Sequence, residues 1–333
     1  MASSIRLSGG GSRPPGTRWY APLRRFLGKE AVQGYLFIAP WFLGLLIFYA
    51  GPLLNTFYNS FTNFDLFNDP TWIGIENYVH IFTHDKVFLQ VCVNMLFYVL
   101  GSTTIIIVGG LFFASLLNRS FPGNHVFRTI IYVPSLLVGV ASGILFKRIF
   151  GTDDVGLANV VLGLFHAGPL NWLSDFDHLW HSMLTLVLVN LWFTGGTMLI
   201  FLAGLKGIAP SYYEAARVDG AGPFRVFFSV TLPLISPAIV LNTILTLINQ
   251  IQVFDIPLTF AQKDGSLNQI NPLGYHNSLG TFLTYIYQQG FLEDKFGYAS
   301  ALAIVVFLIT LLLTLLVLTL ARRLSYYQDL DRG

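Results

Sequence analysis

Cysteine and charge are both scarce in this chain. Its 333 residues include one cysteine, Cys92, which excludes an internal disulfide bond and a metal site built from several cysteines. Charged residues make up 11% of the sequence, whereas soluble domains carry about a quarter. Hydrophobic residues make up 54%, and the mean hydropathy is +0.62. The composition therefore indicates an integral membrane protein.

Several functional motifs are also missing from the sequence. It contains no Gly-x-x-x-x-Gly-Lys-Ser/Thr phosphate loop, so we predict no nucleotide site in this chain and no enzymatic activity of its own. It has no basic block with interleaved aromatic residues, so no nucleic-acid partner is expected. The N-terminal stretch lacks a short apolar core followed by a small-residue cleavage site, so we do not predict a signal peptide.

The hydrophobic segments that are present are long enough to cross a bilayer. Each has about 20 residues or more, which suits a hydrocarbon core of about 30 Å. We therefore predict an all-α membrane domain over residues 34–322, preceded by a basic arm (1–33) and followed by a tail (323–333). The six predicted spans are residues 34–57, 92–117, 129–150, 181–204, 235–257 and 298–321.

The basic residues predict the orientation of these spans. With the N-terminus inside, 14 of the 19 Lys and Arg residues lie on the cytoplasmic side, and positive-inside bias then places both termini in the cytoplasm. Lys147 and Arg148 are the exception, at the outer end of the third span. We expect them to extend toward the headgroups or to pair with Asp153 and Asp154.

A long polar stretch separates the fourth and fifth spans. Within it, Ser211 and Glu214 have the spacing of a capping box, which predicts that a short helix begins at Tyr212. Gly220 and Gly222 are suited to end that helix, and Pro223 is suited to open a second one. The predicted product is a helix-turn-helix outside the bilayer.

The same stretch carries a recognisable pattern. Glu214, Ala215, Ala216 and Gly220 are followed by Val230-Thr231-Leu232-Pro233. This resembles the EAA loop of permease subunits of binding-protein-dependent ABC importers. The resemblance implies a type I ABC importer fold in which residues 205–235, here called the coupling loop, dock into an ATP-hydrolysing subunit. The residues it assigns to ATPase coupling are Glu214, Ala215, Ala216, Asp219, Gly220 and Gly222. The alternative is a capped amphipathic helix at the membrane surface.

Other segments extend the resemblance to roughly residues 30–325. Residues 72–78 (WIGIENY) are similar to a segment after the first helix of sugar-type permeases, as are 171–173 (NWL) and 297–302 (GYASAL) to later segments. They point to the carbohydrate-uptake branch, the relatives of the maltose-transporter permeases. The loop over residues 260–280 is several residues longer than the family's usual Gly-Gly-Pro turn.

The resemblance also implies partners and a location. It predicts two ATP-binding subunits that hold ATP and Mg²⁺, a second homologous permease subunit, an external substrate-binding protein and a carbohydrate substrate, all at a prokaryotic inner membrane. ATP binding would close the ATPase subunits and swing the cavity from inward-facing to outward-facing. No cofactor is expected in this chain itself.

Polar residues inside the spans are candidates for the substrate path. An unsatisfied amide in hydrocarbon costs several kcal/mol, so such residues need a partner. Amides suit sugar hydroxyls, and aromatic rings suit sugar C–H faces. The candidates are Asn94, Tyr98, Asn190, Trp192, Asn242, Thr246, Asn249, Gln250 and Gln252. The alternative for each is an interhelical hydrogen bond that stabilises the bundle, worth roughly 0.6 kcal/mol.

Three other interpretations stay open or are disfavoured by the sequence. A polyol, a glycerol phosphate or an acidic oligosaccharide is an alternative cargo for the same kind of complex. A secondary transporter needs carboxylates deep in a span or inverted repeats, and no Asp or Glu lies deep in a predicted span. Two histidine groups (His80 and His84 with Asp85; His178 and His181 with Asp177) lack a defined third ligand, so we predict no metal site.

Overall fold

The computed structural model of the chain describes residues 30–137, 139–151, 156–167, 169–173, 180–262 and 271–324, with side chains described from residue 34 to residue 320. Within these ranges the secondary structure is helical, apart from one isolated antiparallel bridge between Thr62 and Trp72. The predicted N-terminal arm up to residue 29 and the tail from residue 325 lie outside the described residues. The fold class predicted from the sequence is confirmed.

The chain divides into two units, the first ending at Thr56. This unit contains α2 (Glu30–Leu45), a π-helical turn (Leu46–Ala50) and the start of α3 (Gly51–Asn59). The widened turn precedes Pro52, whose ring and missing N–H prevent regular helical hydrogen bonding at that point. Residues Gly34–Asn59 form a candidate span of 26 residues. Tyr35 and Trp41 are 76% and 68% exposed, as expected for aromatic side chains that face lipid and headgroups.

The second unit holds the remaining helices. They are α4 (Glu76–Thr83), α5 (Lys86–Leu117), α6 (Asn124–Tyr132), α7 (Gly139–Ile149), α8 (Leu157–Leu164), α9 (Trp180–Val189), α10 (Thr194–Lys206), α11 (Pro210–Val218), α12 (Pro223–Val226), α13 (Leu232–Ile251), α14 (Asp255–Ala261), α15 (Phe282–Tyr287) and α16 (Phe296–Leu324). Short 3₁₀ turns cover Val133–Leu136, Asn190–Phe193 and Tyr275–Asn277, and π-helical turns cover Phe227–Thr231 and Gln288–Leu292.

Within the described residues, five helical segments are long and apolar enough to cross a membrane, and a bent pair makes a sixth. The second, fourth and sixth spans lie where the sequence predicts them. The third is not one straight helix over residues 129–150: Asn124–Leu136 and Gly139–Ile149 meet at 101°. Pro134 lies in the 3₁₀ turn before the bend, where a proline disfavours a continuous α-helix.

The fifth span also differs from its prediction. The α-helix does not run unbroken from 235 to 257, because α13 ends at Ile251 and α14 begins at Asp255. At the other end, α12, a π-helical turn and α13 follow one another without a gap, and the apolar segment extends over Pro223–Ala261. The second helix of the coupling loop is therefore the first part of the fifth span, not a separate element.

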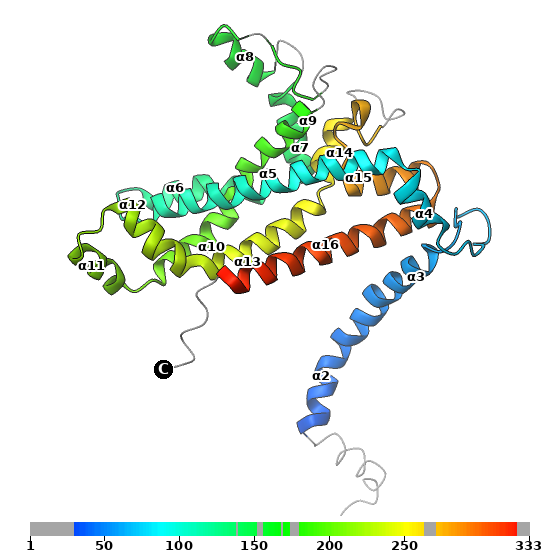
Figure 1. Cartoon of the computed structure of the whole chain (residues 1–333), viewed down its shortest axis with the longest axis horizontal. Coiled ribbons are helices and arrows are strands. Elements are labelled where there is room, and N and C mark those ends of the chain that lie inside the picture. Colours follow the sequence, from blue (N-terminus) through cyan, green and yellow to red (C-terminus); the bar gives the residue numbers. More distant parts are fainter. Residues whose placement is uncertain are drawn as a thin grey trace, which may run out of the picture. The chain divides into compact units, whose positions relative to one another are not determined.

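The centre of the second unit is α5, which packs against α9, α10 and α13. Figure 1 shows α5, α13 and α16 running side by side, with α11 and α12 at one end of this bundle and α4 and α15 at the other. Close approach of α5 and α10 depends on Gly110, where an added Cβ would lie 2.7 Å from Thr197 Cγ2. Large apolar side chains cover much of the outside, as lipid contact requires.

Gly139 and Gly143 of the third span have Gly-x-x-x-Gly spacing and form a close helix contact. A Cβ at Gly143 would lie 2.8 Å from Thr259 Cβ, and one at Gly139 would lie 2.6 Å from Asp255 Oδ2. Only glycine therefore permits α7 and α14 to lie so close together. This contact holds α14 against the outer half of the third span.

In two of the segments that resemble the family, a buried asparagine holds a loop in place by hydrogen bonds. The buried Asn77 amide donates to the carbonyl oxygens of Ser60 and Thr62, at 2.9 and 3.0 Å. The buried Asn159 amide oxygen accepts from Trp172 Nε1 at 2.8 Å, which closes the loop after the third span. Asn159 also bonds the Leu170 N–H and carbonyl. Each of the two amides therefore satisfies backbone groups that a loop cannot pair by itself.

Candidate functional site

The coupling loop projects a nine-residue helix, α11, whose start and end follow from two residues. Pro210 occupies its first turn, where a missing N–H costs nothing and the fixed φ suits a helix. Gly220 has φ +74°, a left-handed conformation that ends a helix readily only at glycine. The Ala221 N–H donates to the Ala216 carbonyl at 2.9 Å and completes this terminus.

Two details of the predicted loop are wrong. The helix begins at Pro210 and not at Tyr212, so Ser211 is already inside its first turn, and neither Ser211 nor Glu214 forms a capping hydrogen bond. Gly222 does not end the helix. It has φ −71° and ψ 166°, ordinary extended values, and precedes α12 as its N-cap residue. Pro223 opens α12 as predicted.

The faces of α11 differ in exposure. Ala216 is buried, and Tyr213 is half-buried with its hydroxyl 3.5 Å from Thr231 Oγ1, which ties the helix to the turn before α13. Glu214, Ala215 and Asp219 are exposed, and Glu214 forms no hydrogen bond or ion pair with another described residue. Val218 is 87% exposed. The helix thus presents small, apolar and acidic groups outward, as a docking surface would.

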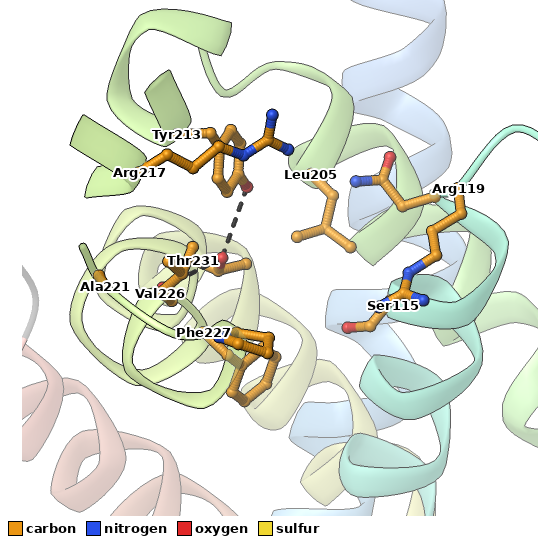
Figure 2. Close-up of a pocket in the computed structure, with 11 residues that line it drawn as sticks. Ser115, Arg119, Leu205, Tyr213, Arg217, Ala221, Val226, Phe227 and Thr231 are labelled. Atoms are coloured by element: carbon orange, nitrogen blue, oxygen red, sulfur yellow. Dashed lines mark hydrogen bonds between the residues drawn. The ribbon is translucent and has the colours of Figure 1, made fainter. Parts of the chain in front are cut away.

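A pocket of about 600 Å³ lies behind α11, between the helix and the bundle. Figure 2 shows Arg217 of α11 and Arg119, just after α5, reaching toward it from opposite sides, with Tyr213, Thr231 and Ser115 on its wall. The Ser115 hydroxyl is buried without a hydrogen-bond partner among the described residues. Sequence reasoning missed this pocket, because its residues come from segments about one hundred positions apart.

Four of the candidate substrate-path residues form hydrogen bonds inside the chain. Asn190 Nδ2 lies 3.2 Å from Tyr98 Oη, 3.1 Å from Ser102 Oγ and 2.8 Å from the Leu186 carbonyl. Asn94 Nδ2 donates to the Asn277 carbonyl at 2.8 Å, and Asn242 Nδ2 donates to the Ala238 carbonyl at 3.0 Å. These amides are hydrogen-bonded to other groups of this chain, as expected for residues that stabilise the helix bundle.

The other candidates divide by exposure. Asn242 and Thr246 are 3% and 7% exposed, whereas Asn249 and Gln252 are exposed, so the candidates on and next to α13 do not share one environment. Gln250 is half-buried, and its Oε1 has no hydrogen-bond partner among the described residues. Trp192 is 38% exposed and packs edge-on against Phe146, at 5.4 Å between ring centroids. Asn249, Gln250, Gln252 and Trp192 thus keep polar or aromatic groups available.

The end of the second unit opposite α11 is held by one carboxylate. Asp85 Oδ2 accepts from the hydroxyls of Tyr285 and Tyr298, both at 2.5 Å, and Asp85 Oδ1 accepts from the Phe88 N–H as the N-cap of α5. Burial, together with the hydrogen bond to Asp85, raises the pKa of Tyr285, so its hydroxyl stays protonated and donates. Asp85 therefore links α5, α15 and α16 through its hydrogen bonds.

The histidine groups considered as metal ligands have other neighbours. The His80 and His84 rings stack with their centroids 6.0 Å apart, and His80 Nδ1 lies 3.3 Å from Tyr298 Oη. Asp85 accepts hydrogen bonds from Tyr285 and Tyr298 instead. Among the described residues, no three His, Cys, Asp or Glu side chains are placed to hold a metal. Asp177 and His178 lie outside the described residues.

The long outer loop is partly described. Residues 263–270 lie outside the description, but Leu273 and Leu279 are each 1% exposed and belong to the core around α5. Lys147 Nζ donates to the Gln262 carbonyl at the start of the loop. The predicted pairing of Lys147 and Arg148 with Asp153 and Asp154 lies outside the described residues.

Comparison with known proteins gives a consistent set of relatives. The family model for the binding-protein-dependent transport system inner membrane component matches residues 106–326. The probable ABC transporter permease protein YesP of Bacillus subtilis is 35% identical over 308 residues, 92% of this chain and 95% of that protein. The arabinooligosaccharides transport system permease protein AraP of the same organism is 30% identical over 298 residues, 89% of this chain and 90% of that protein.

Two solved structures share the fold. A chain of a bacterial ABC transporter involved in the import of the acidic polysaccharide alginate superposes with a TM-score of 0.73 at 21% identity, over 91% of this chain and 99% of that one. A chain of the alginate transporter bound to an alginate pentasaccharide-bound periplasmic protein gives a TM-score of 0.74 at 20% identity, over 93% and 99%. At these identities the likeness concerns the arrangement of the helices.

Proposed function

The chain belongs to the binding-protein-dependent transport system inner membrane component family, and from this membership we propose a specific role for it in an ATP-driven carbohydrate importer. It is a permease subunit of a bacterial inner-membrane ABC importer for sugars or oligosaccharides, and it works with a periplasmic binding protein. It is the transport component and not the catalytic subunit, so ATP is bound and hydrolysed by partner subunits. The observation that carries the proposal is the family match, which includes the whole coupling loop.

In this proposal α11 transmits motion from the ATPase. The exposed Glu214 and Ala215 and the 87% exposed Val218 form the surface that a nucleotide-driven subunit grips. Ala216 and Tyr213 anchor the same helix to the turn before α13, so a displacement of α11 moves the fifth span with it. Two ATPase subunits would be required, one for this chain and one for a second, homologous permease.

The exposed amides on α13 support a substrate path formed with that second permease. Asn249 lies on α13, inside the candidate membrane span Pro223–Ala261. An exposed amide at that depth cannot face lipid without losing several kcal/mol of hydrogen bonding. We therefore place Asn249, Gln250 and Gln252 beside a water-filled path, with Trp192 as a ring for a sugar face. Asn94, Tyr98, Asn190 and Asn242 stabilise the bundle, and the buried Thr246 is a weaker candidate.

The topology in the proposal follows from the basic residues. Arg119, Arg128, Lys206, Arg217 and Arg225 all lie at the end of the bundle that carries α11. Positive-inside bias assigns that end, and with it both chain termini, to the cytoplasm. The end that carries Asp85 and the long outer loop then faces the binding protein.

Purification of the tagged chain from its native membrane tests the assignment. We expect an ATPase and a second permease to co-purify, and ATP hydrolysis in proteoliposomes to rise when a sugar-loaded binding protein is added. Neutral and uronate oligosaccharides, a polyol and glycerol phosphate, each with its binding protein, distinguish the cargo classes. Uptake that needs no ATP and is abolished by an ionophore would refute the importer and indicate a secondary transporter.

A further inference from the structure

The pocket behind α11 is basic and contains unused hydrogen-bonding groups. Arg119 and Arg217 both line it, and neither forms an ion pair with a described carboxylate. No Asp or Glu occurs among the described residues on its wall. Ser115 contributes a buried hydroxyl without a partner, and Tyr213 contributes a phenol. Two guanidinium groups beside hydroxyl groups, with no carboxylate among the lining residues, fit an anion with several oxygens.

Hydrogen bonds to the backbone around Arg119 hold this residue in place. Asn124 Nδ2 donates to the carbonyl of Leu117 at 2.9 Å and to that of Arg119 at 2.5 Å. Arg128 Nη2 also donates to the Leu117 carbonyl, at 3.0 Å. The short segment after α5 is therefore fixed, and Figure 2 shows the Arg119 side chain on the pocket wall beside Ser115.

The pocket lies where the hydrocarbon core gives way to headgroups. Ser115 and Leu205 belong to the last turns of the candidate spans Lys86–Leu117 and Trp180–Lys206, and Phe227 belongs to the first turns of Pro223–Ala261. The charged anion available at that depth is a lipid phosphate. Basic pockets between helices on the cytoplasmic side are known to hold anionic headgroups.

Apolar side chains on the pocket wall and at neighbouring positions in the sequence can contact the acyl chains of a lipid. Leu205, Val226 and Phe227 on the wall are apolar, and their sequence neighbours Phe224 and Phe228 are 82% and 62% exposed, as is Leu116 next to Ser115 at 51%. A soluble anion has no use for these side chains, whereas acyl chains would cover them and remove apolar surface from water. The combination of donors and apolar rim selects a lipid over a free ion.

We propose that this pocket binds the phosphate headgroup of an anionic phospholipid, with Arg119 and Arg217 as its two charged ligands and Ser115 and Tyr213 as hydroxyl donors. Because Arg217 lies on α11 and Arg119 lies at the end of α5, the bound phosphate bridges the coupling helix to the central helix of the bundle. The lipid then stiffens the connection through which α11 would transmit motion. This inference goes beyond the transport assignment and does not depend on it.

Spin-labelled lipids test the proposal directly. The full-length chain, purified with any subunits that accompany it, is placed in phosphatidylcholine nanodiscs that contain a small fraction of spin-labelled phosphatidylglycerol or phosphatidylcholine. We expect an immobilised component selective for phosphatidylglycerol. Losing one arginine should weaken that association about 5-fold, and losing both about 30-fold, from about 1 kcal/mol per basic residue. The variants are Arg119→Gln, Arg217→Gln and their combination.

Arg225→Gln is the matched control, because Arg225 is exposed on α12 near the same surface but does not line the pocket. It should leave the selectivity unchanged. An equal loss in Arg225→Gln would show general surface attraction and overturn the site. If the double variant fails to fold, Ala221→Glu places a carboxylate in the pocket wall and should abolish selectivity; retained selectivity would overturn the proposal.

Competition against the spin-labelled lipid identifies the source of the anion. Excess inorganic phosphate should leave the immobilised component in place, and its displacement would reassign the pocket to a soluble phosphate. Displacement of the lipid by added ATPase subunit would assign the pocket to a protein partner instead. Since none of these measurements uses transport, their failure leaves the importer assignment intact, and failure of uptake leaves the lipid site intact.

Discussion

Replacing Asn190 and Asn249 by leucine in parallel separates a packing amide from a substrate-path amide. Asn190 Nδ2 bonds across to Tyr98 and Ser102 of α5 and back to the Leu186 carbonyl one turn earlier. An amide nitrogen has two hydrogens, so at most two of these three bonds are fully formed at once. Asn249 is exposed and forms no hydrogen bond with another described residue.

The expected magnitude follows from those contacts. Two interhelical hydrogen bonds at roughly 0.6 kcal/mol each give about 1.2 kcal/mol. A buried hydroxyl left without a partner adds roughly 1–3 kcal/mol. We therefore expect Asn190→Leu to lower the free energy of unfolding by about 2–4 kcal/mol. Asn249→Leu should change it by less than about 0.5 kcal/mol, as exposed substitutions do.

Unfolding of the reconstituted chain by steric trapping, run beside sugar uptake in the assembled complex, measures both quantities. Asn249→Leu should reduce uptake while stability stays near the wild-type value, and Asn190→Leu should lower stability first. Equal destabilisation by the two variants would refute the division. So would unimpaired uptake in Asn249→Leu, because the exposed amide would then have no part in the substrate path.

Further substitutions test the other sites. Glu214→Lys reverses the exposed charge on α11 and should leave membrane insertion intact while uncoupling ATP hydrolysis from uptake; full uptake would count against α11 as the coupling helix. Asp85→Ala removes the N-cap of α5 and the acceptor of two tyrosine hydroxyls, so we expect a loss of roughly 2–4 kcal/mol in stability, measured as a lower thermal midpoint. Gly143→Ala places a Cβ 2.8 Å from Thr259 and should cost about 1–3 kcal/mol, whereas Gly163→Ala, where nothing lies within 4 Å, should be neutral or slightly stabilising; equal effects would refute the close-packing argument.

Local chemistry explains which parts of the coupling loop were predictable. Gly220 and Pro223 act through their own backbone restrictions, so their roles as helix end and helix start follow from residue type. The capping box failed because two local signals compete at the same place. Pro210, with no N–H to satisfy, starts the helix before Ser211 can cap it.

Some features of the membrane spans were likewise predictable from the sequence and others were not. Length and hydropathy predict that a segment crosses the membrane, but they do not register bends. The 101° angle after Leu136 and the break after Ile251 depend on how each segment packs against its neighbours. Asn242, Thr246 and Asn249 have the spacing of one helical face, yet only the first two are buried, because neighbouring helices cover part of α13 and leave the rest open.

Hydropathy, charge bias and local motifs act over short distances along the chain, so they suffice to predict a helical membrane protein, most of its spans and the loop that carries the family pattern. They do not predict that Asn190 is paired while Asn249 is exposed, that Asp85 joins three helices, or that Arg119 and Arg217 share one pocket. Each of these facts depends on residues far apart in the chain, whose approach is set by helix packing and not by any signal in the neighbouring sequence.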